Sequence, residues 1–237
     1  MADDQDQKRR LISTGNVELD KKMGGGIPQG SLTLIEGQSQ AGKSVLTQQL
    51  VWGGLQDGKR VAYYSTENTA RSLIRQMKSL SQDITDYFLL GRINIYPMRS
   101  APSADQASDM LRTALRHMTG MGGREILVFD SLSVFVTDIP ERETLGFFTA
   151  VKDMCDQNKT LLLTMHSYAF SETMFIRIRS IADAYMRLRV REIGDQLLKE
   201  MEVVKVRGAD QSTGNVIAFD VEPGLGMRII PMTRAKA

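Results

Sequence analysis

The stretch that decides the fold is residues 37–44, which read Gly37-Gln38-Ser39-Gln40-Ala41-Gly42-Lys43-Ser44. This Gly-x4-Gly-Lys-Ser pattern is typical of a phosphate-binding loop, in which glycines let backbone N–H groups turn onto phosphate oxygens. The apolar run Ser31 to Glu36 precedes it and predicts a buried strand, and Val45 to Leu50 predicts the start of a helix. The N-terminus of that helix adds partial positive charge. The alternative interpretation is an ordinary glycine-rich turn ahead of a helix.

Two side chains in this stretch carry chemistry. Lys43 can reach the β- and γ-phosphates of a nucleotide, and the Ser44 hydroxyl can ligate Mg²⁺. The pattern therefore predicts a nucleotide-binding site made of consecutive residues, namely Gly37, Gln38, Ser39, Gln40, Ala41, Gly42, Lys43, Ser44 and Val45.

Composition excludes several other classes of protein. The 237 residues carry a net charge of +2, with 30 basic and 28 acidic side chains, which does not favour an obligate nucleic-acid binder. One cysteine and two histidines argue against an intrachain disulfide and a Cys/His metal site. No apolar stretch approaches membrane-spanning length, and the polar N-terminus has no signal-peptide core. We expect a cytoplasmic protein, without direct membrane insertion, that reaches the cytoplasmic face of the membrane through partners.

The order of the expected elements indicates an α/β fold. Apolar strands are expected at 31–36, 60–65, 93–96, 126–129 and 160–165, alternating with amphipathic helices at 69–80, 103–118 and 141–157. Such alternation predicts a mostly parallel central sheet with helices on both faces. Beyond residue 184 the pattern changes to antiparallel C-terminal strands, expected at 185–193, 197–207, 216–221 and 227–230.

No linker divides the chain. Residues 1–10 are expected to form a flexible polar N-terminal tail, and 11–237 a single domain. Residues 21–30 (KKMGGGIPQG) are expected to be a turn-rich lead into the first strand of the sheet.

Polar residues follow several of the expected strands. The phosphate-binding loop, Glu67, Asp130 and His166 each come just after one strand. Because ligands of open parallel sheets bind beyond the carboxyl ends of the strands, these four features are expected to converge on one edge.

Each of the three single residues has a functional and a structural interpretation. Asp130 ends a run of four apolar residues and is assigned to hold Mg²⁺ through water, although many buried strands end in a turn-forming aspartate. Glu67 is the candidate catalytic carboxylate that polarises water, or a helix-start carboxylate. His166 is either a sensor of the γ-phosphate or an ordinary histidine at a strand end.

Cations in the C-terminal region form two further groups. Lys205 and Arg207 are two residues apart and share one face of an expected strand. They are either a solvated face or a pair that reaches a neighbouring subunit's phosphates. The best candidate for a basic patch consists of Arg177, Arg179, Arg187, Arg189 and Arg191.

The chain resembles the KaiC-like branch of the RecA superfamily over nearly its whole length. Besides the phosphate-binding loop, the matching pieces are residues 12–15 with 19–20, 25–31, Thr66-Glu67, Asp130-Ser131 and Lys205-x-Arg207-Gly208. The resemblance implies a RecA/KaiC-like P-loop fold, ATP and Mg²⁺ as ligands, Lys205 and Arg207 acting in trans, and a homo-oligomeric ring, expected to be a hexamer. Only one such domain is present here, which disfavours a clock protein with two in tandem.

Among single-domain members, the chain resembles those of the archaeal flagellum, or archaellum. Residues 14–16, 65–68 and 164–166 carry this likeness. It implies an ATP-binding assembly factor whose partners are the motor ATPase FlaI and the scaffold and membrane components of the archaellum. Where hydrolases of this branch have two adjacent acidic residues, this chain has Glu67-Asn68, so hydrolysis is expected to be slow or absent.

Two other functions fit the same fold. One is a recombination or repair ATPase, which the near-neutral charge argues against. The other is an orphan KaiC-like ATPase or autokinase in signalling.

Overall fold

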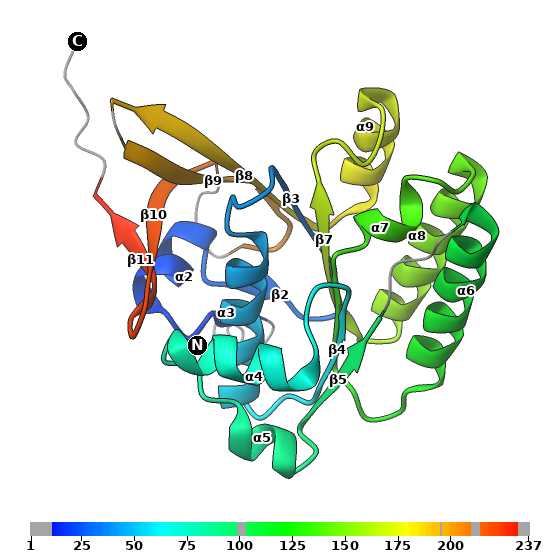
Figure 1. Ribbon diagram of the computed structural model, residues 1–237, viewed down its shortest axis with the longest axis horizontal. Coiled ribbons are helices and arrows are strands. Elements are labelled where there is room, and N and C mark those ends of the chain that lie inside the picture. The colour runs from blue at the N-terminus through cyan, green and yellow to red at the C-terminus, as the bar shows by residue number, and fades with distance from the viewer. Residues whose placement is uncertain (1–10, 99–102, 195, 210–213, 232–237) are drawn as a thin grey trace.

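The computed structural model describes residues 11–98, 103–194, 196–209 and 214–231. Within these residues a nine-stranded sheet has the order β11-β10-β9-β8-β3-β7-β6-β4-β5 (Figure 1). Its strands are β3 (Leu32–Gly37), β4 (Val61–Ser65), β5 (Ile93–Pro97), β6 (Ile126–Asp130), β7 (Thr160–His166), β8 (Ala184–Ile193), β9 (Gln196–Val206), β10 (Val216–Glu222) and β11 (Gly226–Ile230).

The neighbouring strands β8, β3, β7, β6, β4 and β5 run parallel to one another. Strands β9, β10 and β11 extend the sheet beyond β8 in antiparallel fashion. This confirms the predicted fold class. The central strands are buried on both faces, so each reads as a continuous apolar run rather than an alternation. Burial on both faces leaves the strand ends as the place where polar side chains can gather.

Helices cover both faces of the sheet (Figure 1). On one face α2, α3 and α4 pack over alternate strand residues such as Val128 and Leu162, and on the other face lie α6, α7, α8 and α9. The helices are α2 (Val17–Met23), α3 (Lys43–Gln56), α4 (Ala70–Ser79), α5 (Thr85–Leu89), α6 (Ala104–Gly120), α7 (Ser133–Val136), α8 (Glu141–Asp156) and α9 (Glu172–Ile181).

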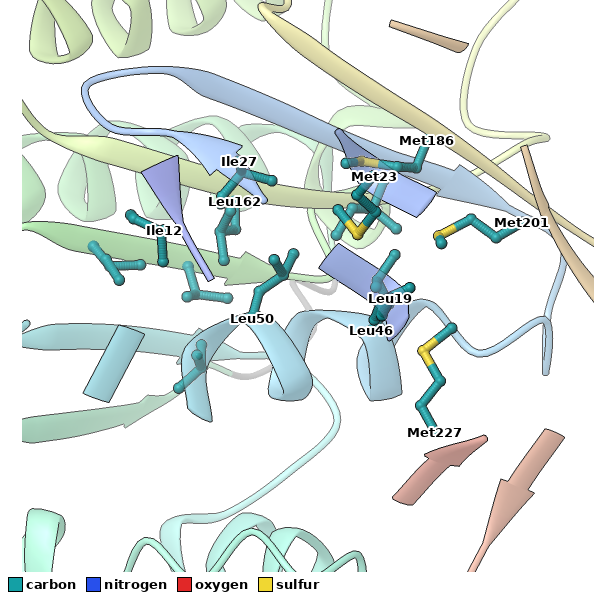
Figure 2. Packing of buried hydrophobic residues seen from close by; sticks show 14 of the residues in the cluster. Ile12, Leu19, Met23, Ile27, Leu46, Leu50, Leu162, Met186, Met201 and Met227 are labelled. Carbon is teal, nitrogen blue, oxygen red and sulfur yellow. The ribbon is translucent and has the colours of Figure 1, made fainter. Parts of the chain in front are cut away.

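Helix α3 is the central element of its face. Figure 2 shows Leu50 of α3 beneath Leu162 of β7, and Leu46 beside Leu19 of α2. Because α3 lies between the sheet and the C-terminal strands, it is buried around most of its circumference, and its polar residues Thr47, Gln48 and Gln49 are buried as well. This packing fixes the start of α3, and therefore the phosphate-binding loop, against the end of β3.

The segment before β3 differs from its prediction. Residues 21–30 do not begin as a turn, since α2 continues to Met23 and ends at Gly24 with φ of 83°. Leu19 and Met23, four residues apart, are both buried and provide the apolar contact that maintains the helix. A two-stranded antiparallel ribbon, β1 (Leu11–Ile12) with β2 (Ile27–Pro28), flanks it. The tail expected at residues 1–10 lies outside the described residues.

At the amino edge of the sheet, a buried carboxylate connects four elements. Asp183, between α9 and β8, accepts hydrogen bonds from the Leu32 amide at 2.9 Å and from Lys152 of α8 at 2.5 Å. Its other oxygen is 3.3 Å from the guanidinium of Arg207, just after β9. Burial alone would raise the pKa of Asp183, but Lys152, the Leu32 amide and Arg207 together hold that pKa below its ordinary value.

We expect Asp183→Ala to lower the free energy of unfolding by about 2–3 kcal/mol at pH 7, because it leaves the buried Leu32 amide and Lys152 without their acceptor. Chemical denaturation measures this. Asp109→Asn is the control, since the exposed pair of Asp109 with Arg112 should contribute well under about 1 kcal/mol.

Acid should reduce the difference between wild type and Asp183→Ala. A carboxyl whose folded-state pKa is depressed stabilises the fold above its unfolded pKa of about 3.9, and this contribution is lost as the pH falls through the folded-state pKa. If the difference stays constant down to that range, the ionised form of Asp183 is not what stabilises the fold.

Candidate nucleotide-binding site

The phosphate-binding loop connects the end of β3 to the start of α3, as predicted. Gly37, the last residue of β3, lies so close to β8 that a Cβ there would be 2.5 Å from the carbonyl oxygen of Leu188. Gly42 has φ of 94°, and a Cβ on it would meet the Phe219 ring at 2.9 Å. Both glycines are therefore required by close packing of the loop against the C-terminal strands.

The N-terminus of α3 is suited to an anion. Four other helices, α2, α4, α6 and α9, begin with a side chain that accepts a hydrogen bond from the first turn, namely Asn16, Thr69, Ser103 and Ser171. In the described residues α3 has no such cap, because Gly42 occupies the position, and no acidic residue lies in its first turn. Its N–H groups and partial positive charge remain available for a phosphate.

Lys43 lies at the centre of the loop. Its side chain is largely buried, and Nζ donates to the carbonyl oxygens of Gly37 at 3.2 Å and Gln38 at 2.7 Å. Nζ also lies 3.2 Å from Nδ1 of His166, at the end of β7, so this ring nitrogen acts as the acceptor. Burial lowers the pKa of Lys43, against the opposing effect of Asp130 and Glu67. Burial and the neighbouring Lys43 lower the pKa of His166, which favours the neutral ring.

Asp130, at the end of β6, receives hydroxyl donors from three elements. Thr164 of β7 donates to Oδ1 at 2.6 Å and Ser44 of α3 donates to the same oxygen at 3.2 Å. Tyr63 of β4 donates to Oδ2 at 2.7 Å. The Asp130 carboxylate is almost fully buried, so these hydrogen bonds take the place of water around the charge.

Glu67 follows β4 and lines the same cavity as Lys43 and Asp130. Burial raises the pKa of Glu67, the nearby Asp130 raises it further, and Lys43 acts in the opposite direction. A carboxylate with a raised pKa is a better proton acceptor, which suits a group that polarises water. The adjacent Asn68 is used structurally, because its amide oxygen accepts from the Ser72 hydroxyl at 2.8 Å.

A cavity of about 360 Å³ connects these groups. It brings together most of the predicted residues, namely Ser39, Gln40, Gly42, Lys43, Ser44, Val45, Glu67, Asp130 and His166. Three predicted residues of the loop are not among those that line the cavity. Gly37 is within β3, Ala41 is buried in the core, and the Gln38 side chain accepts a hydrogen bond from the Val190 amide.

Sequence reasoning missed other residues of the site. Lys199 of β9 and Val221 of β10 line the cavity from the antiparallel strands, and Ser131 follows Asp130. No spacing rule connects these residues of β9 and β10 to a loop more than 150 positions earlier in the chain. Tyr63 and Thr164 were missed because each looks like an ordinary strand residue, although both have a hydroxyl within two residues of a strand's carboxyl end.

The donor set fits a nucleotide with Mg²⁺. Within the described ranges there is no cluster of three or more His, Cys, Asp or Glu side chains that could hold a metal ion by itself. Ser44 and Asp130 offer two oxygen ligands, so phosphate oxygens and water would supply the rest, as Mg²⁺ prefers. The bound metal would draw charge from the phosphates, and Lys43 would bind their oxygens.

Lys205 and Arg207 do not join this site. β9 runs antiparallel to β8, so its last residues lie at the amino edge of the sheet, whereas the loop lies at the carboxyl edge. Lys205 donates to the carbonyl oxygen of Arg179 at 2.9 Å, and Arg207 pairs with Asp183. Any contact of these two cations with a phosphate would therefore involve another subunit.

The candidate basic patch is largely neutralised by neighbouring acids. Arg187 of β8 pairs with Glu202, which lies directly opposite in β9. Arg189 pairs with the same Glu202 and Arg191 with Glu200, in both cases diagonally across the two strands. Of the other two arginines, Arg179 pairs with Glu36 and Glu172, and Arg177 is exposed. These cross-strand pairs do not favour a nucleic-acid surface.

The fold and the site define a P-loop nucleotide-binding protein. Residues 12–234 match the family model described as "ATPase: KaiC". Relatives include the archaeal flagellar ATP-binding protein FlaH of Sulfolobus acidocaldarius, which is 33% identical over 96% of this chain and 100% of its own length. FlaH of Methanocaldococcus jannaschii is 29% identical over 92% of this chain and 94% of its own. The chain belongs to the KaiC family of ATPases and, within it, to the FlaH proteins.

Solved structures agree with this assignment. The crystal structure of the flagellar accessory protein FlaH from Methanocaldococcus jannaschii matches with a TM-score of 0.80 and 27% identity, covering 94% of this chain and 99% of that one. A KaiC-like protein from Pyrococcus horikoshii matches with a TM-score of 0.73 and 22% identity, which supports the fold. None of the helices in the described part of the chain combines the length and apolar character needed to cross a bilayer.

Proposed function

We propose that this protein is an ATP-binding component of the archaellum motor complex, in which MgATP regulates assembly and is hydrolysed slowly. One cluster supports this function above all. Lys43, Ser44 and Asp130 meet beside the uncapped start of α3, at the carboxyl edge of the sheet. The FlaH relatives, named as archaeal flagellar ATP-binding proteins, support the cellular role.

Slow turnover is supported by the second residue of the Glu67-Asn68 pair. Asn68 has no ionisable group, and its side chain is held by Ser72 at the start of α4. One carboxylate, Glu67, therefore remains to polarise water. Such a site can bind ATP tightly while cleaving it slowly, which suits a ligand that controls assembly.

Assembly is proposed to complete the site. Lys205 and Arg207 lie at the edge of the sheet opposite their own loop, and the Arg207 side chain is 58% exposed. A long, exposed cation on a strand end can reach the phosphates of a neighbouring protomer. We propose a homo-oligomeric ring, a hexamer, at the cytoplasmic face of the membrane. Its partners are the motor ATPase FlaI and the scaffold and membrane components.

Removal of the loop lysine tests nucleotide binding. A ligand at a hundredfold excess over its Kd stabilises the folded state by about 2.7 kcal/mol, so MgATP should raise the melting temperature of wild type. Lys43→Ala and Asp130→Asn should each lose most of this rise, and the exposed Lys21→Ala should keep it. A full rise in Lys43→Ala would refute the nucleotide site.

Glu67→Gln tests the catalytic carboxylate. We expect it to lower the slow hydrolysis rate by roughly a hundredfold while ATP affinity changes little, because the group acts mainly in the transition state. Single-turnover hydrolysis and equilibrium binding measure the two effects, with the exposed Glu141→Gln as control. An unchanged rate would leave Glu67 as a helix-start carboxylate, and turnover of tens per second in wild type would contradict the regulatory role.

Arg207→Ala tests completion of the site by a second subunit. We expect it to retain much of the protomer's nucleotide affinity but to lose the increase in mass that MgATP produces in wild type. Light scattering with and without MgATP measures this. Arg112→Ala, which removes a similarly exposed ion-paired arginine from α6, should assemble like wild type. Identical assembly of Arg207→Ala and wild type would show that Arg207 is a solvated cation.

A further inference from the structure

Tyr63 does not line the nucleotide cavity, but it forms a hydrogen bond with Asp130, which does. Its side chain is fully buried in β4, and its hydroxyl donates to Oδ2 of Asp130 at 2.7 Å. The strand register explains the contact. Tyr63 lies opposite Val128 in β6, and Asp130, two residues further on, points to the same face of the sheet.

The contact restrains the carboxylate. Oδ1 of Asp130 accepts hydrogen bonds from Thr164 and Ser44. Within the described residues, the hydrogen bond to Oδ2 comes from Tyr63. A carboxylate held through one oxygen can still rotate about its Cβ–Cγ bond, and a donor on the second oxygen stops that rotation. Hydrogen bonds from outer partners fix the orientation of metal-binding side chains in this way.

A second observation concerns a buried polar side chain next to Tyr63. Gln48, one turn after Ser44 on α3, is fully buried, and within the described ranges neither atom of its amide has a partner of hydrogen-bonding geometry. The Gln48 amide is adjacent to the Tyr63 hydroxyl. That hydroxyl already donates its one hydrogen to Asp130, so it can accept a hydrogen bond from the Gln48 amide nitrogen.

We propose that Tyr63, supported by Gln48, is a positioning residue that holds Asp130 in the orientation that receives Mg²⁺. This inference rests on the proposed function, since it needs MgATP at this site. Tyr63 is not among the residues that line the cavity, and it would act through its hydrogen bond to Asp130. Its effect should therefore be on the concentration of Mg²⁺ that the site requires, and not on the binding of nucleotide without metal.

The next residue provides a matched control. Tyr64 points to the opposite face of β4, and its hydroxyl lies 2.8 Å from Nδ1 of His117, in a cluster with Tyr96. Tyr63→Phe and Tyr64→Phe each remove one hydroxyl from adjacent positions of one strand. Only the first of them removes a hydrogen bond from Asp130.

The experiment is a melting-temperature titration of the purified protein with Mg²⁺ at fixed ATP, with ATP in excess EDTA as the metal-free baseline. In Tyr63→Phe, the midpoint of the Mg²⁺ titration should move to a roughly ten- to hundredfold higher concentration. The shift in EDTA should match wild type. Tyr64→Phe should have the wild-type midpoint. Gln48→Met should move the midpoint in the same direction by a smaller factor. If Tyr63→Phe does not fold, this variant tests whether the support of Asp130 through Tyr63 affects the Mg²⁺ requirement.

The outcomes distinguish failure of the Tyr63 role from failure of the proposed function on which it rests. If wild type shows no Mg²⁺-dependent shift with ATP, the proposed function fails and the role of Tyr63 fails with it. If wild type shows the shift and Tyr63→Phe has the same midpoint, Tyr63 is a structural core residue and the site assignment stands. Equal displacement of the midpoint in Tyr63→Phe and Tyr64→Phe would also overturn the inference, because it would reflect general loss of stability.

Discussion

The hydrogen bonds that converge on the buried carboxylate of Asp130 connect the elements on which the site depends. One donor comes from β4, one from β7 and one from α3, so the carboxylate joins three segments that are distant in the sequence. A buried charge without partners would cost several kcal/mol, and this constraint selects the strand register and the position of α3 together. The start of α3 in turn determines where the loop lies, so the proposed anion site and the proposed metal site depend on the same contacts.

The charges around the cavity bear on the proposed binding of nucleotide together with Mg²⁺. Lys43 and Lys199 are balanced by Glu67 and Asp130, and burial lowers the pKa of both Lys43 and His166. A cavity whose fixed charges nearly cancel attracts a polyphosphate weakly. The N–H groups at the start of α3 and a bound Mg²⁺ would supply the positive charge that the side chains do not.

The two edges of the sheet have separate roles. The carboxyl edge holds the nucleotide site, whereas Asp183 at the amino edge connects β3, α8 and Arg207. In the isolated chain the cations of β9 are engaged with groups of that edge, including Asp183 and the carbonyl oxygen of Arg179. Binding a neighbour's phosphates would exchange these local contacts for stronger anionic partners, which is a physical basis for coupling nucleotide to assembly.

The sequence by itself determined the features that depend on local order. The loop at residues 37–44 and the alternation of strands with helices were predicted from the sequence. The convergence of Glu67, Asp130 and His166 on one edge was also expected, because parallel strands put their carboxyl ends on one edge, although Asp130 and His166 are the last residues of β6 and β7 and do not follow them. Helix α2 was missed because its two buried residues, Leu19 and Met23, give too short a pattern beside the glycines that follow.

Only the tertiary structure decided which distant residues complete the site. Tyr63 and Thr164 reach Asp130, and Lys199 reaches the cavity, through strand register and the path of the antiparallel extension. The same register paired the β8 arginines with acids of β9, which a count of charges could not show. Residue types and spacing along the chain carry no information about pairings between strands far apart in sequence, since those are set by packing of the whole core.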